Sequence, residues 1–171
     1  YHPPDHDLTS PNTKLTYYAV EYSIITWITS KMFTSTVHLD YYMDNGNSWL
    51  KITSSTSNDG NYNWTVPAQN SANCLVRVSN YNFSQFNDVS DTTFTIKPAV
   101  TIITPQGDIT STDWRGCTVT SITFEHGSRW NNYGIQYSIN NGSTWYTINS
   151  SWLATTNPAK FEWDINNVET E

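Results

Sequence analysis

The feature that most constrains the fold of this chain is an internal repeat. Residues 41–52, YYMDNGNSWLKI, recur as residues 137–148, YSINNGSTWYTI. The offset between Gly46 and Gly142 is 142 − 46 = 96 residues. Three further landmarks recur in the same order: residues 25–27 as 122–124, residues 62–64 as 161–163, and residues 9–11 as 103–105. A period of this size matches one β-sandwich domain of about 100 residues. The sequence therefore predicts tandem copies of one domain.

Each copy carries the alternation of a half-buried β-strand. In residues 37–43 the odd positions are apolar or aromatic, whereas His38 and Asp40 are predicted to face solvent. An Asn-Gly pair follows in both copies, and this pair favours a type I′ turn because both central residues take positive φ. Aromatic residues make up 15% of the chain and charged residues only 13%, a balance typical of β-structure. We predict an all-β chain of two tandem immunoglobulin-like (Ig/FN3-like) β-sandwich domains, residues 1–97 and 98–171.

The second copy is shorter than the first. In the first copy, two further strand-like segments follow the Trp64 strand, at residues 74–79 and 92–97, and neither has a counterpart before Glu171. We therefore expect the second sandwich to lack its last strands and to leave a sheet edge open. A fragment of a longer protein is the plainer explanation. The alternative is that a neighbouring chain donates the strands by β-addition.

The motifs of the first copy resemble the Ig-like repeats of large secreted and cell-surface proteins of gliding and polymer-degrading Bacteroidetes. The matching segments are residues 25–27, 42–49, 62–67, 74–79 and 90–96, and the second copy matches the early half. It departs from the pattern at Phe124 and Asn140, where the first copy has Trp27 and Asp44. The resemblance implies a non-catalytic spacer or adhesive module, located outside the cell or at its surface and often exported by the type IX route. Its implied partners are neighbouring repeats of the same polypeptide, and cell-surface proteins or polysaccharide.

The repeated hairpin also resembles the Asp-box of sialidases. Propeller blades recur about every 40–50 residues, whereas these two hairpins stand 96 residues apart, so we predict a structural role. The Asx side chain bonds turn amides, the glycine takes positive φ, and the tryptophan covers the end of the sheet. The hairpin residues are Asp44, Asn45, Gly46 and Trp49 in the first copy, and Asn141, Gly142 and Trp145 in the second.

Catalytic and metal-binding chemistry is not indicated by the sequence. The carboxylates are scattered, although a glycosidase needs two of them about 5–10 Å apart, and the four histidines lack metal-ligand spacing. We predict no enzymatic activity and no cofactor, and we leave calcium open through Asp88, Asp91 and Asp108. A net charge of −7 with eight Lys plus Arg argues against binding to nucleic acid or to an anionic membrane.

Aromatic residues outside the repeat supply an alternative function. Trp27, Trp49, Trp64, Trp145 and Trp163 recur or stand at repeat positions, so we expect them in the core or at sheet ends. The aromatic residues that do not recur are Trp114, Trp130, Tyr133 and Trp152. If these four share one exposed face, the chain is an accessory carbohydrate-binding module of a secreted polysaccharide-degrading enzyme, because sugars stack on such platforms. If they anchor loops, that reading fails.

The two cysteines fall on different strands of different copies. Cys74 lies on a late strand of the first copy, and Cys117 on an early strand of the second. We expect Cys74 to be a buried thiol, and the partner position of Cys117 to fall beyond Glu171. The competing hypothesis is a bridge between Cys74 and Cys117, which requires their Cα atoms to lie within about 7 Å.

Overall fold

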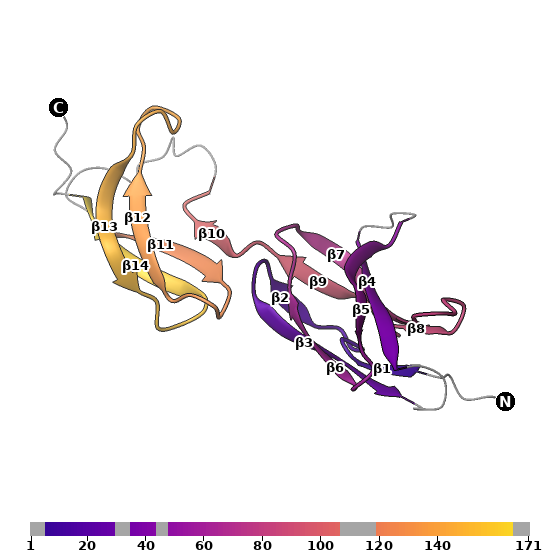
Figure 1. The fold of residues 1–171 in the computed structure, drawn as a ribbon. Helices are drawn as coiled ribbons and strands as arrows, with labels where there is room; N and C mark the ends of the chain where they lie inside the picture. Colours follow the sequence, from indigo (N-terminus) through magenta and orange to yellow (C-terminus); the bar gives the residue numbers. More distant parts are fainter. Residues whose placement is uncertain (1–5, 30–34, 44–47, 107–118, 166–171) are drawn as a thin grey trace. The chain divides into compact units, whose positions relative to one another are not determined.

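In the part of the chain that the structure describes, β-strands form the sheets of two compact units (Figure 1). The computed structural model describes residues 6–29, 35–43, 48–106 and 119–165. Unit 1 comprises residues 1–99 and unit 2 comprises residues 100–171. Each unit packs two β-sheets face to face, so the predicted class of tandem Ig/FN3-like sandwiches is confirmed.

Unit 1 has one three-stranded and one six-stranded sheet. The first sheet has the order β1 (His6–Ser10), β3 (Tyr22–Thr29), β6 (Asn61–Thr65). The second has the order β2 (Thr16–Tyr18), β9 (Phe94–Lys97), β7 (Ser71–Asn80), β4 (Thr36–Tyr42), β5 (Leu50–Ser57), and β8 (Asn87–Val89) also pairs with β7. All pairs are antiparallel except β2 with β9, which are parallel.

The core of unit 1 is filled from both sheets at alternate strand positions, as the period of two predicts. The first sheet and the residues around it bury Leu8, Ile25, Trp27, Trp64 and Val66, and the second sheet buries Val37, Leu39, Cys74, Val76, Val78, Phe94 and Ile96. Strands β7 and β9 contribute five of these side chains, so they are a large part of the core. Cys74 is a buried thiol, as predicted.

Unit 2 repeats the first part of this plan. Its first sheet has the order β10 (Val100–Thr104), β11 (Val119–His126), β14 (Ala159–Asp164), and its second sheet pairs β12 (Asn132–Tyr137) with β13 (Tyr146–Leu153). The irregularity between Leu8 and Ser10 in the β1–β3 pair recurs between Ile102 and Thr104 in the β10–β11 pair. Among the described residues, unit 2 has no counterpart of β7 or β9, as the shorter second copy predicts.

The core of unit 2 is correspondingly small. Its buried cluster consists of Phe124, Ala154 and Ala159, with Ile122, Tyr133 and Trp152 packed against it. Several apolar side chains of unit 2 are instead exposed: Val100, Ile102, Val119, Ile139 and Leu153. The described strands of unit 2 therefore cover less apolar surface than those of unit 1.

Candidate functional site

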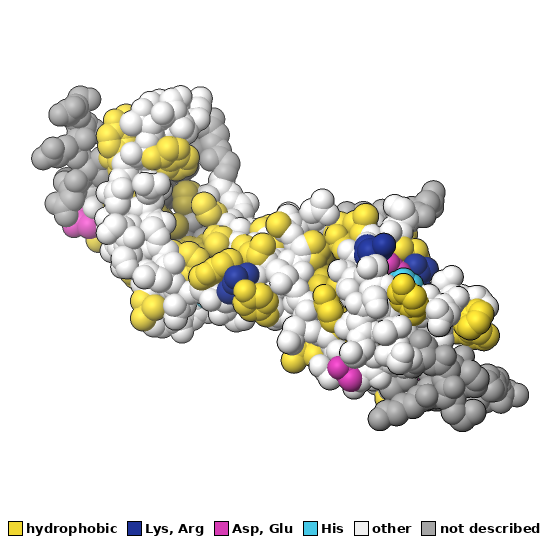
Figure 2. Space-filling view, viewed as in Figure 1, with side chains coloured by type: hydrophobic (Ala, Val, Ile, Leu, Met, Phe, Trp, Pro, Cys, Tyr) yellow, Lys and Arg dark blue, Asp and Glu magenta, His cyan; other side chains and the backbone are white. Residues whose placement is uncertain are grey.

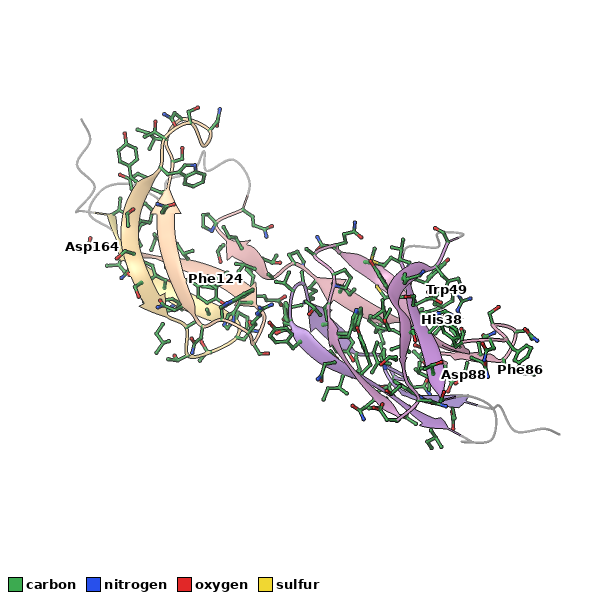
Figure 3. The ribbon with its side chains drawn as sticks, in the orientation of Figure 1. His38, Trp49, Phe86, Asp88, Phe124 and Asp164 are labelled. Atoms are coloured by element: carbon green, nitrogen blue, oxygen red, sulfur yellow. The ribbon has the colours of Figure 1, made fainter. Side chains whose placement is uncertain are left out.

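An apolar groove of about 500 Å³ lies between the two sheets of unit 2. Ile102, Phe124 and Trp163 line it from the first sheet, and residues 133–139, from β12 and the segment that follows it, line it from the other side. Figure 2 shows hydrophobic side chains inside a hollow in the face of unit 2 that carries β10 and β12, and Figure 3 places Phe124 on β11. The groove therefore occupies the space between the sheets that a complete sandwich would fill.

The groove is open to the main-chain edge of β12. Side chains of consecutive strand residues point to opposite faces, yet the lining takes in seven consecutive residues, 133–139. Such a run arises where the edge of the strand itself borders the groove. Within the described part of the chain, β12 pairs with β13 alone. In unit 1 the corresponding strand β4 pairs with β5 on one side and with β7 on the other.

Aromatic rings form part of the groove lining. The ring centroids of Tyr137 and Trp163 are 5.2 Å apart, and Tyr137 also stacks on Tyr146 at 5.2 Å. Ile139 also lines the groove and has an exposed fraction of 75%. Its counterpart in unit 1, Met43, packs against the core. Of the residues that line this groove, the sequence singled out Tyr133 alone as a candidate binding residue.

Of the four aromatic residues proposed for sugar binding, two lie inside unit 2. Tyr133 and Trp152 are a cross-strand pair and both meet Phe124 edge to face, at 5.1 and 6.1 Å between centroids. Trp130 is 49% exposed, and its ring centroid lies 4.6 Å from the Arg129 guanidinium carbon. The Trp130 main-chain carbonyl accepts a hydrogen bond from the Tyr133 hydroxyl at 2.6 Å. Trp114 lies outside the described residues. The structure thus brings Tyr133 and Trp152 together as packing residues and leaves Trp130 at the surface.

The repeat explains why unit 2 carries these two aromatic residues. Tyr133 and Trp152 pair at the position where Val37 and Thr56 pair in unit 1. Phe124, a smaller ring, stands where unit 1 has Trp27. The larger cross-strand pair therefore compensates for volume lost at Phe124, as close packing requires.

The second hairpin forms the predicted turn. Asn141 and Gly142 have φ of 54° and 82°, and the Ser143 amide donates to the Asn140 carbonyl at 3.2 Å, which defines a type I′ turn. The Asn140 side-chain oxygen accepts from the Thr144 amide at 2.8 Å. In this turn Asn140 therefore bonds a turn amide through its side chain, and Asn141 and Gly142 take the two positive φ angles. Asp44, Asn45 and Gly46 of the first hairpin lie outside the described residues.

The two hairpin tryptophans differ from each other. Trp49 lies 4.3 Å from the Arg77 guanidinium, which also binds Asp40 at 2.8 Å. Trp145 is 57% exposed, and a Cβ at Gly142 would lie 3.5 Å from its ring. Trp145 therefore lies over its own turn, at the end of the β12–β13 hairpin. Trp49 differs in that it also has Arg77 of β7 against its ring, and β7 has no described counterpart in unit 2.

The loop between β7 and β8 carries exposed aromatic residues that the sequence reasoning passed over. Tyr81, Phe83 and Phe86 are 48%, 53% and 45% exposed, and Figure 3 shows Phe86 in this loop. Beneath them Asn80 is fully buried, and its side-chain oxygen accepts from the amides of Asn82 and Phe83 at 2.9 and 3.2 Å. The Asn80 side chain at the end of β7 thus binds the main chain of the loop that carries these exposed aromatic residues.

The acidic residues considered for calcium have structural partners. Asp88 accepts from the Leu8 amide at 2.7 Å, and Asp91 accepts from the Asn12 side chain at 2.9 Å, whereas Asp108 lies outside the described residues. Across the described ranges, His, Cys, Asp and Glu form no group of three that could hold a metal ion. The same ranges include no helix with the length and apolarity to cross a membrane.

The strand order and register define the chain as an Ig/FN3-like β-sandwich protein. No family model matches the chain, and no curated protein matches it. Among solved structures it is similar to the fibronectin(III)-like modules of CbhA from Clostridium thermocellum, with 16% identity and a TM-score of 0.34, over 93% of this chain and 78% of that chain. At that level of similarity the fold assignment rests on the strand pairing described above.

Proposed function

We propose that this chain is a non-catalytic, load-bearing module of a larger secreted or cell-surface protein. Two tandem copies of one sandwich, with the same strand registers, support a repeat whose role is to extend or present the protein that contains it. The motif resemblance supports Ig-like repeats of Bacteroidetes surface proteins, exported by the type IX route. Neighbouring repeats of the same polypeptide are the proposed partners, and the apolar loop at Tyr81, Phe83 and Phe86 supports an adhesive contact with a surface protein.

The observation that carries the load-bearing role is the parallel pairing of β2 with β9. Thr16 pairs with Thr95 and Tyr18 with Lys97, and the Thr95 amide donates to the Leu15 carbonyl at 2.9 Å. The Ala19 amide donates to the Lys97 carbonyl at 2.8 Å. Since β2 lies near the start of unit 1 and β9 at its end, tension along the chain pulls the two strands past each other. All bonds of the pair then resist together instead of opening one by one.

Single-molecule stretching of the chain tests this role. A Thr95→Pro variant loses the amide that bonds Leu15, so we expect unit 1 to unfold at a clearly lower force. Thr95→Val keeps the amide and is the matched control, with an expected force equal to that of the unchanged chain. Unit 1 is recognised by its released length, about 280 Å for the 97 − 16 + 1 = 82 residues from Thr16 to Lys97, at roughly 3.4 Å per residue. Equal unfolding forces in the two variants would refute the proposed role.

Carbohydrate binding is the second candidate, and one observation favours it. The Trp130 indole is half exposed beside the Arg129 guanidinium, and an exposed indole is a stacking surface for a sugar ring. In this reading the chain is an accessory module of a polysaccharide-degrading enzyme. Affinity electrophoresis in gels containing soluble glucans measures it: binding requires a retarded chain and a Trp130→Ala variant that runs as in a gel without glucan. An equal mobility with and without glucan would remove this candidate.

A further inference from the structure

We propose that the outer face of the six-stranded sheet of unit 1 carries a binding strip for an extended, uncharged polysaccharide chain. Figure 2 shows this face, where basic, acidic and histidine side chains gather among hydrophobic ones, and Figure 3 labels His38 and Trp49 on it. The proposal is independent of the load-bearing role and uses none of the residues considered for sugar binding in unit 2. The members of the strip are Tyr42, Trp49, Asp40, Arg77, His38 and Tyr81.

The alternation of β4 places the strip on the outer face of the sheet. Leu39 is fully buried in the core, and side chains of successive strand residues point to opposite faces. His38, Asp40 and Tyr42 therefore point away from the core. Residues directly opposite each other in a strand pair share a face, so Arg77, the partner of Asp40 on β7, points outward as well.

One end of the strip is a packed pair of aromatic rings. The ring centroids of Tyr42 and Trp49 are 5.6 Å apart, and the Arg77 guanidinium carbon lies 4.3 Å from the Trp49 ring centroid. Both rings are half-buried. The C–H face of a sugar ring packs on the partly negative face of an aromatic ring. Because its neighbours already hold the Trp49 ring, this stacking surface loses little side-chain freedom when a ligand binds.

The middle of the strip is an ion pair. Arg77 Nη2 donates to Asp40 Oδ2 at 2.8 Å, and the two side chains are 27% and 16% exposed. Their charges compensate each other, which favours an uncharged ligand. The pair still offers guanidinium donors and carboxylate acceptors, and a sugar hydroxyl both donates and accepts. Lys51, the partner of Asp40 on β5, instead lines a separate hollow with Tyr62 and Asn63.

The other end of the strip is a second pair of rings. His38 and Tyr81 stack at 4.9 Å between centroids with 17° between their planes, and His38 Nε2 lies 3.2 Å from the Tyr81 carbonyl oxygen. From His38 to Tyr42 the strand advances about 14 Å, at roughly 3.4 Å per residue. Rings therefore stand at both ends, with hydrogen-bonding groups between them. An apolar partner would cover the rings but would leave the polar atoms of the ion pair without partners, whereas a sugar chain matches both.

Calorimetric titration of the full chain with a β-(1→4)-linked glucose hexamer tests the proposal, because this oligosaccharide is extended and uncharged. Trp49→Ala should weaken binding about tenfold or more, since the stacking ring is lost. Trp145→Ala is the matched control: Trp145 stands at the same motif position in unit 2 and is 57% exposed, and its loss should leave the affinity unchanged. The amide signals of Val76 and Val78 verify that unit 1 of each variant is folded.

A second pair of variants tests the other end of the strip. Tyr81→Ala should weaken binding about threefold or more, because one ring of the strip is removed. Phe83→Ala removes a ring from the same loop that is 53% exposed and lies outside the strip, so the affinity should stay unchanged. In NMR spectra, the hexamer should shift the side-chain N–H signals of Trp49 and Arg77 and leave the indole signal of Trp130 in place.

Four results would overturn the proposal. Equal losses for Trp49→Ala and Trp145→Ala would show that the strip is not the site. Shifts at Trp130 alone would place sugar binding in unit 2 and would support the second candidate function instead. Binding that is restricted to a galacturonate hexamer and weakened by added salt would show an anionic ligand. No binding of either hexamer would leave a protein as the partner of this face. None of these results bears on the unfolding force of unit 1, so the load-bearing role is tested separately.

Discussion

Truncation of Phe94 to alanine is predicted to destabilise unit 1 by about 4 kcal/mol. Phe94 is fully buried and is the largest of the fully buried side chains. Its ring meets Tyr17 at 5.3 Å and Trp64 at 6.1 Å, both in the edge-to-face geometry that aromatic rings prefer. Removing a buried phenyl ring costs about 3–5 kcal/mol, which includes the cavity that remains. We take the middle of that range, because Phe94 is fully buried and two aromatic contacts are lost together.

Urea titration followed by the NMR signals of the Val76 and Val78 amides measures this loss within unit 1. A domain of this size has a urea dependence of about 2 kcal/mol per molar, so the midpoint should fall by about 2 M. Phe86→Ala is the matched control: it removes the same ring from an exposed loop position and should change the stability of unit 1 by less than about 0.5 kcal/mol. A midpoint that shifts equally in the two variants would refute the inference that β9 closes the core of unit 1.

Three further predictions concern buried polar groups and turns. Ser90→Ala removes the hydroxyl that accepts from the Val76 amide at 3.0 Å and should cost about 1–3 kcal/mol in chemical denaturation, because that amide is left unsatisfied. Gly60→Ala should destabilise unit 1 more than Gly142→Ala destabilises unit 2, since both glycines have positive φ but only the first would bring a Cβ within 2.9 Å of a main-chain oxygen. Burial raises the pKa of the Tyr41 hydroxyl above its usual 10.0, and the negative charge of the Cys74 thiolate raises it further. The stability that this shift contributes is therefore complete below the pKa that Tyr41 has in the unfolded chain. It is lost as the pH rises through the pKa that Tyr41 has in the folded chain.

Each of these has a result that would contradict it. An unchanged denaturation midpoint for Ser90→Ala would mean that water or another group replaces the hydroxyl. Equal losses at Gly60 and Gly142 would show that φ alone, and not the close approach at Gly60, sets the cost. For Tyr41, the ultraviolet titration of the chain minus that of a Tyr41→Phe variant isolates one phenol, and a midpoint at or below 10.0 would contradict the direction of the shift.

The repeat made much of the fold predictable. The period of two placed Val37, Leu39 and Tyr41 on the inner face of one strand, and the Asn-Gly pair predicted the positive φ of Asn141 and Gly142. These are local rules, since the side-chain period and the turn geometry depend on neighbouring residues only. The shorter second copy also agrees with the described residues of unit 2, which include no counterpart of β7 or β9.

What the sequence could not predict depends on partners that are distant along the chain. Trp49 and Trp145 stand in the same motif, but only Trp49 has an arginine from β7 beneath it. Tyr133 and Trp152 stand out in the sequence because they do not recur, and their common contact with Phe124 is seen only in the structure. A substitution compensated by two others on different strands leaves no local pattern, so only the packed structure reveals it.

The buried amide of Asn80 separates the shape of the β7–β8 loop from the identity of its tip. The Asn82 and Phe83 amides donate to the Asn80 side-chain oxygen, so these bonds do not depend on which side chains the loop carries at 83 and 86. Positions 83 and 86 can therefore exchange one residue type for another while the sandwich below is inherited unchanged, whereas Tyr81 is tied to that sandwich by its stacking on His38 of β4 at 4.9 Å. Copies of such a repeat could diverge in what they recognise without first having to solve a new folding problem.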